Sequence, residues 1–157
     1  MNNFLFKKIN WKILIFCFLI VFGVAFIGSL FTSQSVNSEW YDSIKPSITP
    51  PSFVFPIVWN ILFFLIALSL YFVWINSKEK KKIILLFGFN FVLNILWSVF
   101  YFGLRNPLFA FIVIIFLLIS IISLILSSRK INKFAFFSLI PYFVWVSFAS
   151  VLNFLSI

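Results

Sequence analysis

The sequence predicts an all-α membrane protein, a bundle of five transmembrane helices with one long loop. Of its 157 residues, 64% are hydrophobic and only 10% are charged, whereas an ordinary soluble domain carries about 25% charged residues. Five uncharged apolar runs occur in the chain, and each is about long enough to cross ~30 Å of hydrocarbon as a helix. This composition excludes a soluble enzyme and a disordered chain. Residues 1–157 are predicted to form a single domain, because no internal repeat divides them.

The apolar runs define the helices in order. The first run follows three lysines, as in a signal peptide, but it is too long and lacks a small-residue cleavage site, so we expect it to remain as a helix. The five predicted spans cover residues 13–31, 53–75, 83–104, 108–126 and 134–157, approximately. The fourth has no Trp, Tyr, Asn or Pro, and we expect it to face lipid or a partner. The last three loops are only a few residues long, which predicts antiparallel neighbours.

The first loop, about 32–52, differs from the others in length. It has about twenty residues, and loops that long are usually functional or disordered. Its rigid and aromatic residues are Trp40, Tyr41, Pro46, Pro50 and Pro51. They favour an ordered cap on the bundle over a flexible linker.

Charges alternate along the loops. The N-terminal tail carries +3, and the four loops carry −1, +3, +1 and +3 in turn. By the positive-inside rule, this pattern places the N-terminus in the cytoplasm and the first loop outside, in what we expect to be a prokaryotic cell membrane. The basic clusters lie beside the spans, where they contact anionic lipid headgroups. Nucleic-acid binding is therefore not expected.

The residue inventory excludes several kinds of site. The chain has no histidine, a single cysteine, Cys17, and three acids, Glu39, Asp42 and Glu79. These residues make no zinc site, no Ser-His-Asp triad and no His-ligated haem, so we expect no metal and no required cofactor. The spans contain no ionisable carboxylate, Lys or Arg. A proton-coupled transporter would need such a relay.

Polar and rigid residues recur on three of the predicted helices. In the third span they are spaced as one helical face, and the fifth span repeats that spacing. The three sets are Asn90, Asn94, Trp97 and Tyr101 in the third span; Tyr142, Trp145, Ala149 and Asn153 in the fifth; and Pro56, Trp59, Asn60 and Phe63 in the second. An amide is costly in hydrocarbon, so these faces should point into the bundle. A pocket walled by indoles with a few amides suits a large, planar, apolar ligand with polar edges.

Simpler interpretations of the same residues stay open. Asn90 and Asn94 can hold helices together without any ligand. Tryptophan and tyrosine also gather near span ends as membrane anchors. A pair of small residues, Ala25 and Ser29, fits a close helix contact between two protomers.

Several motifs together resemble the tryptophan-rich sensory protein or translocator protein family. The first loop and second span read Trp40-Tyr41, Lys45-Pro46-Ser47, Pro50-Pro51 and Phe55-Pro56-x-x-Trp59. The third span reads Asn90-x-x-x-Asn94-x-x-Trp97-Ser98. The fifth reads Pro141-Tyr142-x-x-Trp145-x-x-Phe148-Ala149-x-x-Leu152-Asn153. Each motif alone is weak, but their order along about 28–153 resembles the family specifically.

The resemblance implies a five-helix bundle whose long first loop caps a ligand pocket, a porphyrin-type ligand and a homodimer. It implies pocket roles for Tyr41, Trp59, Asn94, Trp97, Trp145 and Ala149, with Trp59 and Trp145 tied to a porphyrin reaction. We add Pro51 from the loop and Asn90 and Tyr142 from the polar faces as ligand-binding candidates. This chain departs from the family at Ile48, Phe53 and Phe63, where members often carry Trp or Tyr, and it lacks the cholesterol motif of animal members at its end.

The function expected from the resemblance is binding of porphyrins or similar planar ligands. Protoporphyrin IX, or haem held by stacking alone, fits best, because the chain has no His and its only Met is Met1. Light-dependent breakdown of protoporphyrin IX, through oxidation of Trp59 or Trp145, or stress sensing would follow from such binding. The alternative is a carrier or regulatory scaffold without chemistry. A third hypothesis is a structural membrane partner whose polar faces only pack helices.

Overall fold

The computed structural model describes residues 9–157, and the regular elements within that range are all helices. Five of them are long and apolar enough to cross a membrane. They are α1 (Trp11–Ser35), α3 (Val54–Asn76), α4 (Lys80–Ser98) with its extension η1 (Val99–Gly103), α5 (Pro107–Ile131) and α6 (Lys133–Phe154). A short helix, α2 (Glu39–Ile44), lies in the first loop. The predicted class, an all-α bundle of five transmembrane helices, is confirmed, and the chain is a multi-pass integral membrane protein.

Asparagine and serine side chains set where several helices begin. The side chains of Asn10, Ser38, Asn106 and Asn132 accept hydrogen bonds from backbone amides in the first turns of α1, α2, α5 and α6. Such caps satisfy amides that have no partner inside the helix. Asn132 also closes α5 through its backbone, because its N–H donates to the Ser128 carbonyl at 2.8 Å. One residue thus separates α5 from α6.

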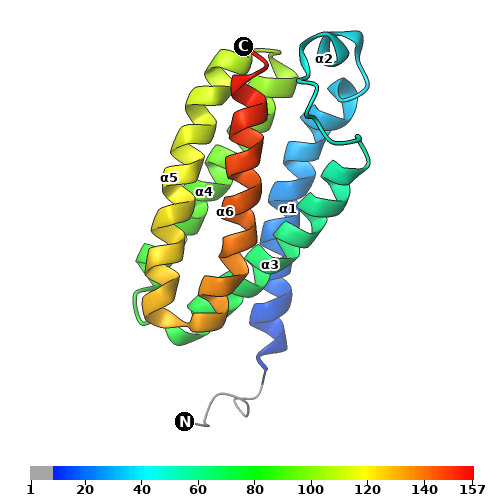
Figure 1. Cartoon of the computed structure of the whole chain (residues 1–157). Coiled ribbons are helices and arrows are strands. Elements are labelled where there is room, and N and C mark those ends of the chain that lie inside the picture. The colour runs from blue at the N-terminus through cyan, green and yellow to red at the C-terminus, as the bar shows by residue number, and fades with distance from the viewer. Residues whose placement is uncertain (1–8) are drawn as a thin grey trace.

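The helices form two groups that share α6 and α4. α5 packs between α4 and α6, whereas α3 packs against α6 and α1, and α1 also contacts α4 and η1 (Figure 1). The core between them includes Val21, Ile66, Ile114, Ile121 and Leu139, each almost fully buried. α5 buries one face against α4 and α6. Its other side exposes large apolar residues, including Ile112, Phe116 and Ile119, as expected of a helix that faces lipid or a partner.

The two ends of the bundle differ in charge. The start of α1, the α3–α4 loop and the α5–α6 junction share the lower end in Figure 1, whereas α2 and the C-terminus lie at the upper end. The lower end therefore gathers Lys12, Lys78, Lys80 to Lys82, Arg129, Lys130 and Lys133. Lys7 and Lys8 lie outside the described residues. The grouping of basic loops matches the pattern from which a cytoplasmic N-terminus is predicted.

The third span ends in one turn of π-helix. The Leu104 amide donates to the Val99 carbonyl at 2.8 Å, five residues back. This wider turn lets Tyr101 and Phe102 both lie buried, although they are adjacent in sequence. Single π turns within helices often occur at functional sites. Here the turn keeps Tyr101 in line with Trp97 and adds Phe102 to the same side of the bundle.

Candidate functional site

A cavity of about 740 Å³ lies among α1, α3, α4 and α6 and reaches the first loop. Its volume falls within the roughly 300–1,000 Å³ typical of small-molecule pockets. Residues lining it include Ala25, Gly28, Ser29 and Thr32 of α1, Tyr41 and Phe53 of the loop segment, Trp59, Asn60 and Phe63 of α3, Asn94, Trp97, Ser98 and Tyr101 of α4 and η1, and Ala149 and Asn153 of α6. None of the residues that line the cavity is charged.

Two pairs of stacked aromatic rings form much of the wall. Trp59 stacks on Phe63 with ring centroids 5.4 Å apart, and Trp97 stacks on Tyr101 at 5.5 Å. The Trp97 indole is also held at its edge, because its Nε1–H donates to Oδ1 of Asn153 at 3.0 Å. Asn153 in turn donates to the Pro107 carbonyl at 2.8 Å. Flat indole faces fixed in this way are suited to stack against a planar ligand.

A buried network of hydrogen bonds lies behind the wall and positions Asn94. The Asn94 Nδ2 donates to the Tyr142 hydroxyl at 3.2 Å, and that hydroxyl donates to Oδ1 of Asn90, also at 3.2 Å. The Asn90 Nδ2 then donates to the Ser120 hydroxyl at 2.7 Å. Among residues 9–157, no hydrogen bond uses the Asn94 side-chain carbonyl. Asn94 therefore brings an acceptor to the cavity that is available to a ligand N–H.

The first loop is held at one end of the cavity by aromatic contacts. The Tyr41 ring packs 5.7 Å from Phe102 and 6.4 Å from Tyr101, and Trp40 lies 6.0 Å from Tyr101. The hydroxyl of Ser35, at the end of α1, donates to the Phe102 carbonyl at 3.0 Å. Burial raises the pKa of Tyr41 to about 12, with the neighbouring Tyr101 and Asp42 adding to the effect. Tyr41 thus meets the cavity as a neutral phenol at neutral pH.

The cavity is open on one side. Its lining residues on α4, η1 and α6 are buried or half-buried, whereas several on α1, α3 and the loop are exposed. Phe26 and Phe53 each keep 65% of their surface exposed, and Ser29 and Asn60 are also exposed. The opening therefore lies between α1 and the start of α3. Because both helices are membrane spans, this opening faces the bilayer and the adjoining interface.

The candidates proposed from the sequence fall into two groups. Tyr41, Trp59, Asn94, Trp97 and Ala149 line the cavity. Asn90 and Tyr142 are fully buried in the network behind the wall, where they position Asn94.

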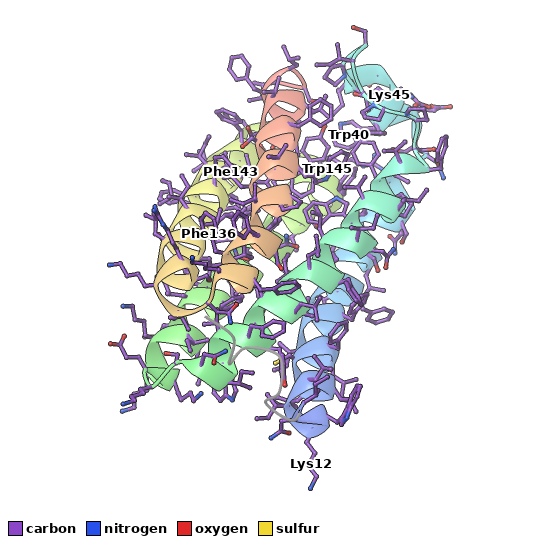
Figure 2. All side chains as sticks on the ribbon, turned by 60° about the horizontal axis from the view of Figure 1, so that its bottom comes forward. Lys12, Trp40, Lys45, Phe136, Phe143 and Trp145 are labelled. Carbon is purple, nitrogen blue, oxygen red and sulfur yellow. The ribbon has the colours of Figure 1, made fainter. Side chains whose placement is uncertain are left out.

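Pro51 and Trp145 lie beside the cavity. Pro51 is exposed and adjoins Ser52, which lines it. Trp145 projects from α6 toward α3 (Figure 2) and packs its ring 5.8 Å from Phe55, another lining residue. Its Nε1–H is buried and has no hydrogen-bond partner among the described residues. Trp145 thus contacts a lining residue but does not itself line the cavity.

Sequence reasoning missed the contribution of α1 to the site. Ala25, Gly28, Ser29 and Thr32 all line the cavity, and their spacing is that of one helical face. The sequence contains this pattern, but the spacing of Ala25 and Ser29 equally fits a contact between protomers. Ser120 was also missed, because a serine in an apolar span gives no sign that it bonds Asn90.

The chain is similar to known proteins of one family. The sequence profile of the TspO/MBR family matches residues 16–156. The tryptophan-rich protein TspO of Archaeoglobus fulgidus is 42% identical over 142 residues, which cover 87% of this chain and 89% of that protein. The protein of the same name from Chlorobaculum tepidum is 36% identical over 141 residues, 88% of this chain and 89% of its own. The translocator protein of Ovis aries is 27% identical over 135 residues, 81% of this chain and 80% of its own.

Proposed function

The chain belongs to the TspO/MBR family, and from this premise we propose that it binds a porphyrin-type planar ligand in the cavity among α1, α3, α4 and α6. The observation that carries the proposal is the pair of indole faces, Trp59 and Trp97, in a cavity of about 740 Å³ with Asn94 beside them. Stacking supplies affinity for an aromatic macrocycle. The described residues that line the cavity include no His, Cys or Met that could ligate a haem iron, which favours a metal-free porphyrin such as protoporphyrin IX.

The polar edge of such a ligand belongs at the opening. Hydroxyl and amide groups of Ser29, Thr32, Asn37, Ser52 and Asn60 line the cavity on the side of α1, the loop and α3. They can donate to carboxylates, whereas the deeper lining on α4 and α6 is largely aromatic or aliphatic. We therefore propose that the ligand enters from the bilayer between α1 and α3 with its apolar edge leading, and that the first loop caps its outer end.

Light-driven breakdown of protoporphyrin is the reaction that we propose for the site. An indole in contact with a photoexcited porphyrin can give up one electron, and dioxygen is the terminal oxidant of the porphyrin ring. Trp59 is the better placed donor, because it lines the cavity and no hydrogen bond among residues 9–157 holds its N–H proton. Trp145 does not line the cavity, and its ring packs against Phe55, which does. The protein would orient the ligand, and the ligand would supply the photochemistry.

A carrier or regulatory role without chemistry is the second candidate. Relatives named tryptophan-rich sensory protein, in Cereibacter sphaeroides, and translocator protein, in Ovis aries, carry names that refer to sensing and to transport. The open side of the cavity also suits exchange of a ligand with the membrane. In this case the indoles act only as walls.

One titration separates the two candidates. Protoporphyrin IX is added to the protein in phosphatidylcholine nanodiscs, and Trp fluorescence and the Soret band are followed in the dark and under light. For a reactive site, Trp59→Phe keeps binding to within about fivefold, since stacking loses ~1 kcal/mol, but it loses most of the bleaching. Bleaching by Trp59→Phe at the wild-type rate supports the carrier. Absence of saturable binding to the wild-type protein contradicts both candidates.

Dimer formation is a separate proposal. The small residues Ala25 and Ser29 line the cavity, so support for a homodimer now rests on the family resemblance alone. Cross-linking in nanodiscs that hold more than one chain tests it, and a single monodisperse monomer across several mild detergents would contradict it.

A further inference from the structure

A second cavity, of about 420 Å³, lies at the basic end of the bundle, away from the aromatic site. It is formed where α3 ends, α4 begins and α5 ends. Three lysines, Lys78, Lys82 and Lys130, contribute to its lining. These side chains come from the α3–α4 loop, the first turn of α4 and the last turn of α5. The fold therefore brings together positive charges that are about fifty residues apart in the sequence.

The positive charge of this cavity is only partly neutralised. Glu79 also lines it and pairs with Lys82, with the Nζ and Oε2 atoms 3.3 Å apart. Within residues 9–157, neither Lys78 nor Lys130 has a carboxylate partner. Two ammonium groups thus remain for an anion.

A buried hydroxyl faces the same cavity. Ser128 lines it and keeps only 1% of its surface exposed. Its backbone carbonyl accepts from the Asn132 amide, but no hydrogen bond in the described part of the chain engages its hydroxyl. An oxygen-rich ligand in the cavity can accept a hydrogen bond from this hydroxyl.

The remaining wall is apolar and continues into the spans. Ile83, Phe87 and Leu124 line the cavity and are almost fully buried. A free inorganic anion gains nothing from such a surface. An amphiphile with a charged head and a hydrocarbon tail matches both halves, and basic pockets between spans are known to hold anionic lipid headgroups.

We propose that this cavity binds the phosphodiester headgroup of an anionic membrane lipid. Lys78 and Lys130 contact the phosphate, the Ser128 hydroxyl donates to one of its oxygens, and the first methylenes of an acyl chain pack on Phe87 and Leu124. The site differs from general attraction of lipid to basic loops, because Lys81 and Arg129 lie in the same clusters and do not line the cavity.

That difference supplies a matched control for the test. The Lys78→Gln/Lys130→Gln variant and the Lys81→Gln/Arg129→Gln variant each lose two positive charges from the same two segments. Both proteins, with the wild type, are purified in phosphatidylcholine-containing micelles and titrated with phosphatidylglycerol, with retained lipid counted by native mass spectrometry. We expect the cavity variant to bind at least about fivefold more weakly than the control variant, the factor that corresponds to one lysine–headgroup contact of ~1 kcal/mol. Equal losses in the two variants would overturn the proposal.

Two further arms identify the ligand and the role of the hydroxyl. Ser128→Ala keeps all charges, and it should weaken phosphatidylglycerol binding by about threefold without lowering the melting temperature in phosphatidylcholine alone, since only the contact to the phosphate is lost. Unchanged binding would overturn the assigned contact. Glycerol 3-phosphate carries the same phosphate ester without a chain, and it should not protect the protein against thermal unfolding where phosphatidylglycerol does. Equal protection would show a site for soluble phosphate esters and overturn the lipid assignment.

Discussion

Removal of the Tyr142 hydroxyl tests the network that positions Asn94. Tyr142 is fully buried, and its hydroxyl makes two hydrogen bonds of 3.2 Å, one from Asn94 and one to Asn90. In Tyr142→Phe both amides lose a partner. Asn94 lines the cavity and can turn to water there, whereas Asn90 is fully enclosed and keeps only its bond to Ser120.

The expected cost follows from these differences. Side-chain hydrogen bonds between membrane helices average about 0.6 kcal/mol, with a maximum of about 1.7. Two such bonds, one of them leaving the enclosed Asn90 carbonyl without a partner, predict a loss of about 1–2 kcal/mol in the free energy of unfolding. Tyr41→Phe is the matched control, because Tyr41 is also buried but no hydrogen bond among residues 9–157 uses its hydroxyl. We expect it to change the free energy of unfolding by less than about 0.5 kcal/mol.

The assay is reversible unfolding of both variants in mixed micelles, titrated with sodium dodecyl sulfate and followed by far-UV circular dichroism. Equal losses in Tyr142→Phe and Tyr41→Phe would refute the network as the source of the effect. So would a Tyr142→Phe protein as stable as the wild type. In that case the two asparagines would be held by packing alone.

Three other perturbations have signs set by the structure. Trp145→Phe removes the buried Nε1–H that has no partner, which is stabilising, and reduces the contact with Phe55, which is destabilising. Because the two effects offset each other, the free energy of unfolding should stay within about 1 kcal/mol of the wild type. A loss above ~3 kcal/mol in chemical unfolding would contradict this. Burial of the neutral Tyr41 phenol, whose pKa is raised to about 12, stabilises the fold fully below pH 10 and progressively less as pH rises from 10 through 12. The melting temperature of the wild type should therefore fall over this range, and that of Tyr41→Phe should fall less. Identical curves would refute the raised pKa of Tyr41. Gly103→Ala places a Cβ 2.9 Å from a ring carbon of Phe31, so thermal unfolding should show a destabilisation of about 1–3 kcal/mol, and an unchanged melting temperature would show that the ring yields freely.

Hydropathy was sufficient to predict the five spans, because the cost of exposing polar groups to lipid forces each apolar run into a helix. It did not predict where the helices end. The run predicted at about 108–126 became α5 to Ile131, because Arg129 and Lys130 continue the helix past the hydrocarbon. Positive charge at the C-terminus of a helix stabilises the helix. Apolar runs therefore mark the membrane core and not the helix boundaries. Pro141 lies inside α6, and the helix continues through it.

The site was partly predictable for a related reason. Asn94, Trp97 and Tyr101 share one face of a helix, and the spacing alone places them together. The π turn that adds Phe102 leaves no mark in the spacing. Small residues on α1 have the same pattern whether they border a cavity or a second protomer. Only the packing of α1 against α3 and α4 distinguishes these two cases.

Placement of the ligand among α1, α3, α4 and α6 is tested most directly by a pair of substitutions in α1. Ser29 lines the cavity at its open side, whereas its neighbour Leu30 is exposed and does not line it. The dissociation constant of protoporphyrin IX is measured for Ser29→Trp and Leu30→Trp in phosphatidylcholine nanodiscs. We predict that Ser29→Trp binds at least about tenfold more weakly than the wild type, which corresponds to ~1.4 kcal/mol, and that Leu30→Trp stays within about twofold. Equal affinities in the two variants would contradict binding in this cavity.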